Sequence, residues 1–343
     1  KSAESAQIGF DACSQCFVQA RRSVAHRESI PRRARGLAPR CCDRQTLPSM
    51  LSQVRRRKLA LPDSAIEIAL LDWGGEGPLA LLHHATGFCA GVWGPVAERL
   101  SDHYRVIAMD ARGHGDSSKP EGADCYRWEF FGRDVLGVAE VLAAEHPDGR
   151  VALGIGHSFG GSSILMASAE RPDLFERNVL VDPVILPPAW ARAASAADSP
   201  GNALAEGARN RRQVWPSRQA ARVKWLEKEL FADWDPRALD LYLAEGLADR
   251  PDGQVELKCS GEIEAAIFEA TGSFDLWSSA DRVRTPTLIA WAARGLFPRA
   301  IFQKLAACMT DARVCDVDAG HLAPMQHPDR VVAPILEFAS RSS

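Results

Sequence analysis

The sequence lacks any apolar run that approaches the length of a bilayer-spanning helix, so no transmembrane segment is expected. It also lacks a basic excess, since a net charge of −3 argues against a nucleic-acid-binding protein as a whole. The nine cysteines show no regular spacing, and several lie inside apolar segments. This usage is typical of reduced thiols in a cytoplasmic protein and argues against a disulfide framework. With 46 % hydrophobic and 25 % charged residues, the chain of 343 residues has the composition of a soluble globular protein.

Residues 1–58 differ from the rest of the chain, because they carry thirteen lysines and arginines against four acidic residues and show no apolar period. Three interpretations are open. A transit peptide is rich in arginine and serine, but this segment shows no clear amphipathic helix. A zinc site would use the four cysteines of the segment, whose second pair is adjacent and poorly suited to tetrahedral coordination: Cys13, Cys16, Cys41 and Cys42. We favour a disordered extension, with Met50 as a plausible initiator.

From Leu59 onward, short apolar runs alternate with longer stretches of helical periodicity. Strands are expected at 65–73, 78–83, 105–109, 151–155, 178–181, 287–291 and 313–317. Helices are expected at 92–100, 128–145 and 163–171. This alternation predicts βαβ units and a mostly parallel sheet, which is an α/β fold.

Between 186 and 279 the pattern changes to helices alone. Ser217 offers an N-cap before a helix with Val223, Leu226 and Leu230 on one stripe. Asp235 caps the next helix, with a proline at its first position. We therefore expect a helical insertion over the sheet.

The most informative stretch is the turn at 156–160, Gly-His-Ser-Phe-Gly, which follows a buried strand and precedes a helix. A G-x-S-x-G between a strand and a helix is a nucleophile elbow. Glycines permit a backbone turn too sharp for a Cβ, and this turn exposes the serine hydroxyl at the tip of the strand. Ser158 is therefore a candidate nucleophile.

Four segments together resemble the α/β-hydrolase superfamily over about residues 65–340: GHSFG at 156–160, HATGF at 84–88, DARGHGDS at 110–117 and AGHLAPMQHPD at 319–329. The resemblance implies an α/β-hydrolase fold, with a mostly parallel central sheet flanked by helices. It also implies a core of residues 59–186 and 280–343, and a helical cap at 187–279. The family places its cap there, between the sixth and seventh strands of the sheet.

A serine hydroxyl needs a base that accepts its proton. His321 follows the last expected strand, and the family order of Ser, acid and His favours it as this base. His327 precedes a proline and has the pattern of a helix-entry residue. His157 neighbours the nucleophile, but adjacent residues on an elbow point in different directions.

The acid of the triad has two possible positions in this family. Many similar enzymes carry it after the seventh strand, where residues 291–298 of this chain contain no carboxylate. The alternative, as in haloalkane dehalogenases, is after the sixth strand, where Asp182 lies. Asp182 precedes a proline and could be a simple turn former. Three further aspartates are weaker rivals: Asp275, Asp281 and Asp318. We favour Asp182, because it alone lies at an expected strand tip.

The oxyanion of an acyl-transfer reaction needs two backbone N–H donors. The resemblance assigns one to Phe159, the residue after the nucleophile, and the other to Thr86 of the HATGF loop. The loop has Ala85 where the family has glycine. In that family the segment containing Asp110, Arg112 and His114 is structural and holds the loop beside the active site.

These assignments predict a serine hydrolase that cleaves an ester, lactone or thioester of a small apolar substrate without a metal or cofactor. A serine in the elbow disfavours the epoxide and halide chemistry of relatives with an aspartate nucleophile. Five tryptophans of the insertion suggest an apolar acyl pocket: Trp190, Trp215, Trp225, Trp234 and Trp277. The alternatives are a C–C hydrolase or lyase on the same fold, or a non-catalytic binding protein.

Overall fold

The structure, a computed structural model, describes residues 54–62, 64–186 and 200–341. Residues 50–343 form one compact unit. Most of the basic segment 1–58, including the four cysteines considered as zinc ligands, lies outside the described residues. Within the described part of the chain, no helix is both long enough and apolar enough to cross a membrane.

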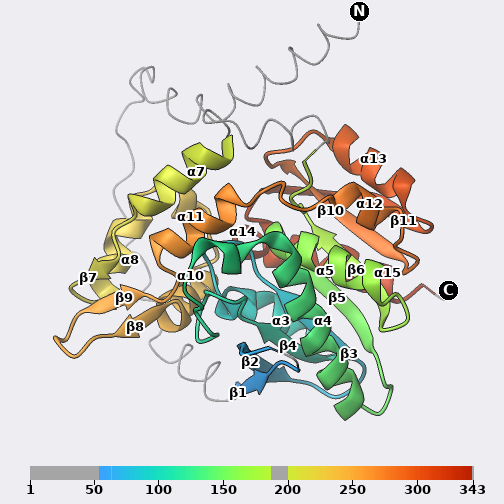
Figure 1. Ribbon diagram of the computed structural model, residues 1–343, viewed down its shortest axis with the longest axis horizontal. Helices are drawn as coiled ribbons and strands as arrows, with labels where there is room; N and C mark the ends of the chain where they lie inside the picture. The colour runs from blue at the N-terminus through green and yellow to red at the C-terminus, as the bar shows by residue number, and fades with distance from the viewer. Residues whose placement is uncertain (1–53, 63, 187–199, 342–343) are drawn as a thin grey trace, which may run out of the picture. The chain divides into compact units, whose positions relative to one another are not determined.

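An eight-stranded sheet with the order β1-β2-β4-β3-β5-β6-β10-β11 forms the centre of this unit (Figure 1). The strands from β4 to β11 run parallel, whereas β2 pairs antiparallel with both β1 and β4. Their bounds are β1 Arg55–Ala60, β2 Glu67–Gly74, β3 Leu79–His83, β4 Arg105–Met109, β5 Val151–His157, β6 Phe175–Val181, β10 Thr287–Arg294 and β11 Ala312–Gly320. The α/β fold with a mostly parallel central sheet is confirmed.

Both faces of the sheet are buried, because helices cover each of them. Alternation along β3 sends Leu79 and Leu81 to one face and Leu82 to the other. The first face packs against α4 Trp128–Glu145, α5 Phe159–Glu170, α12 Leu276–Ala280 and α13 Arg299–Cys308. The second packs against η2 Ala90–Trp93, α3 Gly94–Leu100, α14 Ala323–Gln326 and α15 Pro328–Ala339. Burial on both faces explains why the central strands read as continuous apolar runs.

The first strand, β1, begins before the predicted boundary of the ordered core at Leu59. It starts at Arg55 and pairs along its length with β2. Its sequence, RRRKLA, gives no strand signal, because only Leu59 of this edge strand is buried. Arg57 instead donates to Glu145 of α4 at 2.6 Å. The prediction that all of residues 1–58 form a disordered extension is therefore wrong for residues 55–58.

The insertion between β6 and β10 is not composed of helices alone, which corrects the prediction. Besides α12, the helices in its described residues are α7 Pro200–Arg209, α8 Arg218–Leu226, α9 Glu229–Ala232, α10 Pro236–Glu245 and α11 Gly261–Glu269. A three-stranded antiparallel sheet is interleaved with them: β7 Val214–Trp215, β8 Leu247–Asp249 and β9 Val255–Leu257. These strands are only two or three residues long, too short to give a periodic signal. The predicted caps are present, since Ser217 accepts from the Ala220 N–H and Asp235 from the Arg237 N–H.

The expected apolar stripe of α8 does not face the core. The side chains of Val223 and Leu226 are half exposed, as is that of Leu230 on α9. The buried face of α8 carries Ala221 and Trp225 instead. Trp225 stacks on other aromatic rings of the insertion, and this packing sets the rotation of the helix.

The tryptophans predicted for the pocket have other contacts. Trp215, Trp225 and Trp234 are buried in one apolar cluster within the insertion, and this cluster also contacts Phe88. Trp277 is partly buried and donates its indole N–H to the Leu186 carbonyl at 2.7 Å. Trp190 lies outside the described residues. Trp215, Trp225 and Trp234 are therefore part of the core of the insertion.

Candidate active site

The turn between β5 and α5 has the strained geometry of a nucleophile elbow. Ser158 has φ 56° and ψ −121°, a conformation that side-chain-bearing residues seldom adopt. A Cβ on Gly156 would lie 2.3 Å from the Gly160 carbonyl oxygen, and one on Gly160 would lie 2.4 Å from the His83 carbonyl oxygen. Only glycine fits at these two positions. The sequence therefore forces the chain through a turn that presents Ser158 at the carboxyl end of β5.

The structure brings the three predicted residues together. The Ser158 hydroxyl donates to His321 Nε2 at 2.9 Å, and His321 Nδ1–H donates to Asp182 Oδ2 at 2.6 Å. The residues follow β5, β6 and β11, whose carboxyl ends lie at one edge of the parallel sheet. Asp182 is fully buried, whereas the His321 side chain keeps 18 % of its surface exposed. A nucleophile, a base and an orienting acid require such an arrangement, and the assignment of these roles to the three residues stays a prediction.

Asp182 is built into the end of β6 by its backbone and both carboxylate oxygens. It shares with Ser158 the rare positive φ, here 42°. Its N–H donates to the Ala290 carbonyl at 2.8 Å, and Oδ1 accepts from the Ala292 N–H at 3.2 Å. A Cβ on Gly295 would lie 2.6 Å from Asp182 Oδ2, so the carboxylate fills the space beside the segment after β10. A side chain at position 295 would therefore collide with the carboxylate of Asp182.

The rival aspartates have other contacts. Asp275 caps α12 by accepting from the Trp277 and Ser278 N–H groups. Asp318 pairs with Arg294 and Arg330, and Asp281 lies exposed at the end of α12. His327 occupies the N-cap position of α15, as expected of a helix-entry residue, and its side chain makes no capping hydrogen bond. In the described part of the chain, no group of three or more His, Cys, Asp or Glu side chains is arranged to hold a metal ion.

His157 has a contact that sequence reasoning did not identify. Its ring is buried, and Nε2–H donates to the backbone carbonyl of His321 at 2.7 Å. Burial, with a further contribution from the neighbouring His321 ring, lowers the pKa of His157 to about 3. The ring therefore stays neutral and fixes the loop that carries the proposed base. This contact joins residues far apart in the sequence, so the G-x-S-x-G motif does not predict it.

The two candidate oxyanion donors lie on segments that meet at the elbow. Phe159 is the first residue of α5, where a backbone N–H has no partner within the helix. Thr86 lies in the turn after β3, which the Phe88 N–H closes by donating to the Ala85 carbonyl at 3.2 Å. A Cβ on Gly160 would lie 2.6 Å from the His84 carbonyl oxygen, so this turn starts directly beside α5. The assignment of the two N–H groups to an oxyanion hole stays a prediction.

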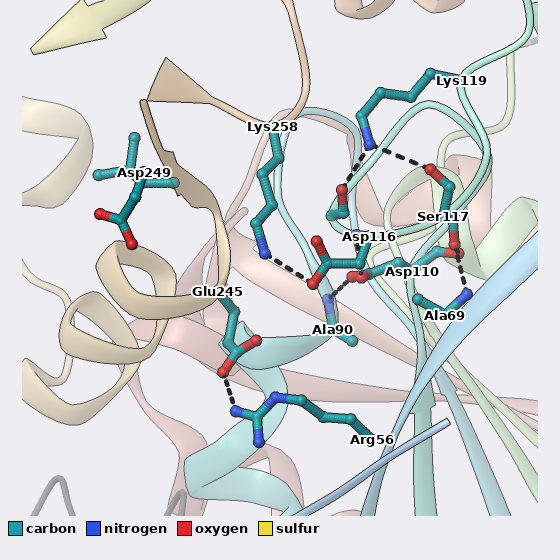
Figure 2. Close-up of polar contacts among 12 residues, drawn as sticks. Arg56, Ala69, Ala90, Asp110, Asp116, Ser117, Lys119, Glu245, Asp249 and Lys258 are labelled. Carbon is teal, nitrogen blue, oxygen red and sulfur yellow. Dashed lines mark hydrogen bonds and ion pairs between the residues drawn. The ribbon is translucent and has the colours of Figure 1, made fainter. Parts of the chain in front are cut away.

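Asp110 anchors the segment that follows β4 (Figure 2). Its buried carboxylate accepts from the N–H groups of Ala90 at 2.7 Å and Asp116 at 2.9 Å. Asp116 also forms an ion pair with Lys258 of the insertion at 2.7 Å (Figure 2). The carboxylate of Asp110 thus ties together two loops, and its hydrogen bonds go to these two N–H groups.

Three other polar side chains make buried hydrogen bonds in the same region. Arg112 forms a buried bidentate ion pair with Asp134 of α4, with both N–O distances at 2.6 Å. His114 Nε2 accepts from the Gly87 N–H at 2.9 Å, and His84 Nε2 accepts from the Ala111 N–H at 3.0 Å. These contacts fit the structural role that the resemblance implies for the segment.

Comparison with known proteins agrees with this fold. The chain matches the alpha/beta hydrolase family over residues 80–333. A 2-(acetamidomethylene)succinate hydrolase of Mesorhizobium japonicum is 38 % identical over 108 residues, or 32 % of this chain and 36 % of the relative. The chain therefore spans only about a third of the length of that curated relative. The N-formylmaleamate deformylase of Pseudomonas putida is 28 % identical over 285 residues, which cover 78 % of this chain and 91 % of that enzyme.

A solved structure of E-2-(acetamidomethylene)succinate hydrolase superposes with a TM-score of 0.68 and 24 % identity. It covers 84 % of this chain and all of its own. Identity at this level supports the fold alone, whereas the family match extends over most of the sequence. The family match over residues 80–333, the order of the sheet and the elbow together show that the chain belongs to the α/β-hydrolase family.

Proposed function

We propose that this protein is a serine hydrolase that cleaves an acyl bond through an acyl-enzyme intermediate. One observation carries the proposal: the continuous hydrogen-bond chain from Ser158 Oγ through His321 to Asp182, at 2.9 and 2.6 Å. A hydroxyl aligned on a neutral imidazole can attack a carbonyl carbon while its proton passes to Nε2. The buried carboxylate holds the required tautomer and stabilises the imidazolium that forms.

The reaction then proceeds in two balanced halves. Attack by Ser158 Oγ forms a tetrahedral oxyanion, which accepts from the backbone N–H groups of Phe159 and Thr86. Collapse of this intermediate breaks the acyl bond, and the leaving group takes the proton from His321. Water attacks the acyl-enzyme with His321 again as base, and the acid product leaves as Ser158 regains its proton.

The substrate class that we propose is a small molecule with an apolar acyl group. Apolar side chains neighbour each proposed catalytic element: Phe159 after the nucleophile, Phe88 after the oxyanion turn and Leu322 after the base. The deformylase among the relatives supports testing amides beside esters, lactones and thioesters. The five cysteines of the described residues are all free, which supports a reducing compartment such as the cytoplasm.

Replacing the nucleophile tests this function. Ser158→Ala removes the attacking oxygen while leaving the packing of the elbow intact, so kcat on a chromogenic ester should fall by a factor on the order of 10⁶. A fluorophosphonate probe should label the wild-type protein and fail to label this variant. Ser163→Ala is the matched control, because that hydroxyl donates only to the Phe159 carbonyl within its own helix. Labelling of Ser158→Ala, or hydrolysis by it near the wild-type rate, would contradict the proposal.

A further inference from the structure

The glycine after Thr86 is held on both sides by side chains from distant parts of the chain. The Gly87 N–H donates to His114 Nε2 at 2.9 Å. Its carbonyl accepts from the hydroxyl of Tyr242, which lies on α10 of the insertion, also at 2.9 Å. Gly87 has φ +81°, as the third position of a tight turn requires. Two independent elements therefore fix the turn that carries the proposed oxyanion donor.

The bond to Tyr242 acts on one particular peptide plane. The Phe88 N–H closes the turn by donating to the Ala85 carbonyl, and the Gly87 carbonyl belongs to the same peptide unit. Tyr242 therefore holds the opposite end of the peptide whose N–H closes the turn. Without that hydroxyl only the Phe88 N–H holds this peptide, and the turn that presents the Thr86 N–H loses one of its two external anchors.

Arg211 fixes the direction of the Tyr242 hydroxyl. Its Nη2 donates to the Tyr242 oxygen at 3.0 Å, and a guanidinium has no acceptor to offer in return. The hydroxyl proton is therefore left for the Gly87 carbonyl. Glu264 pairs with Arg211 Nη1 and compensates its charge. Burial raises the pKa of Tyr242 to about 12, so the hydroxyl stays a donor throughout the range in which the triad works.

We propose that Tyr242 is a positioning residue through which the insertion orients the Thr86 donor of the oxyanion hole. Arg211 and Glu264 set the hydroxyl of Tyr242 for this task. The inference rests on the proposed serine hydrolase function and extends it, because it gives the insertion a part in transition-state stabilisation. Tyr242 itself contacts no reacting atom in this scheme.

Tyr242→Phe isolates the hydroxyl. The ring lies 5.3 Å from Phe88 and 5.0 Å from Trp225, centroid to centroid, and phenylalanine preserves this packing. Removing one direct oxyanion donor costs about 10²–10³ in kcat in a related chemistry, so loss of its positioning should cost about tenfold or more. KM should change by less than about threefold, since the ground-state carbonyl depends less on the hole than the oxyanion does.

The affinity for a transition-state analogue distinguishes a positioning role from a merely structural one, because a merely structural role would leave this affinity unchanged. An apolar trifluoromethyl ketone forms a tetrahedral oxyanion on the serine, so its inhibition constant should rise in parallel with the loss of kcat. Tyr126→Phe is the matched control: the Tyr126 hydroxyl is also in a buried tyrosine and donates to a loop carbonyl, that of Pro120, at 2.8 Å. This control should keep both kcat and the inhibition constant of the ketone.

The inference is overturned if Tyr242→Phe keeps kcat and ketone affinity within about twofold of wild type, or if Tyr126→Phe loses as much of both. If Tyr242→Phe does not fold, Arg211→Lys is measured in the same assays. That variant keeps Tyr242 and the positive charge but removes the planar fork that orients the hydroxyl, so a smaller loss of the same kind is expected. Labelling of Ser158 by the fluorophosphonate in wild-type protein separates this failure from failure of the proposed function.

Discussion

Ser158 and Asp182 are the only non-glycine residues with positive φ in the described part of the chain. Such conformations cost about 1–3 kcal/mol each and persist only where the surrounding structure enforces them. Here the enforcement is visible, because close backbone approach at Gly156 and Gly160 leaves the elbow no other path. The strain is thus concentrated at two members of the proposed triad, where it directs the hydroxyl and the carboxylate toward His321.

At the residue scale, the charge of the buried Asp182 leads to a prediction about catalysis. Asp182→Asn preserves the shape of the side chain but removes the charge that fixes the His321 tautomer, so kcat should fall by roughly 10⁴ with KM nearly unchanged. The control variants Asp275→Asn, Asp281→Asn and Asp318→Asn should each change kcat by less than about tenfold, because these aspartates are exposed. All four variants are compared on one chromogenic ester. An active Asp182→Asn beside an inactive variant at one of the other positions would move the acid to another strand.

At the scale of elements, β1 is an edge strand that no pattern in the sequence predicts. Its arginines make ion pairs with three separate elements: Arg55 with Asp72 of β2, Arg56 with Glu245 of α10 and Arg57 with Glu145 of α4. Arg56 therefore connects the sheet edge to the insertion, as Figure 2 shows. All three arginine side chains stay largely exposed to water, which weakens each ion pair, so the backbone pairing with β2 is the main contribution of this strand.

Two shortened chains test this element. A chain that starts at Met50 retains β1 and should keep the activity and melting temperature of the long form. A chain that starts at Leu61 lacks the strand, the buried Leu59 side chain and the hydrogen bonds between β1 and β2, so its melting temperature should fall by about 10 °C. Thermal unfolding of both chains beside the full sequence provides the comparison. Equal melting temperatures for the two shortened chains would show that β1 adds no stability.

At the scale of the whole unit, four histidines are buried as neutral rings around the elbow and its neighbouring loops: His83, His84, His114 and His157. Burial is the leading cause that lowers the pKa to about 3 for His83 and His157 and to about 4 for His84. It also lowers the pKa of His114 well below its usual value. Burial raises the pKa of two buried carboxyl groups, Asp110 and Asp134. Their effect on the pH dependence of stability is opposite to that of the histidines, because their protonation favours the folded state as the pH falls.

This set of rings predicts sensitivity to mild acid. The unfolded chain binds protons at histidine below about pH 6.5, whereas the folded chain keeps these rings neutral. The contribution of these neutral rings to the free energy of unfolding is therefore present in full above about pH 6.5 and is lost as the pH falls toward 4. Between pH 7.5 and 5.5 the four rings together should lower the free energy of unfolding by about 5 kcal/mol, less the contribution of the raised carboxyl groups. Urea unfolding at half-unit pH steps measures this loss. A constant free energy of unfolding over that interval would contradict the prediction.

The sequence by itself determined the parts of this protein that depend on local chemistry. The elbow glycines, the caps at Ser217 and Asp235, and strands buried on both faces each leave a pattern within a few neighbouring residues. The order of strands and helices then placed Ser158, Asp182 and His321 at the carboxyl ends of parallel strands. For that reason the three predicted site residues lie within hydrogen-bond distance in the structure.

Only the tertiary structure decided the contacts between segments far apart in the chain. The β1 strand exists because β2 offers an open edge, and the stripe of α8 is exposed because Trp225 packs inward. The bonds from His157 to the His321 carbonyl and from Tyr242 to the Gly87 carbonyl join residues 164 and 155 positions apart. Backbone carbonyls are identical in every residue, so no side-chain pattern marks which of them a distant donor will reach. Three-dimensional packing alone makes that selection.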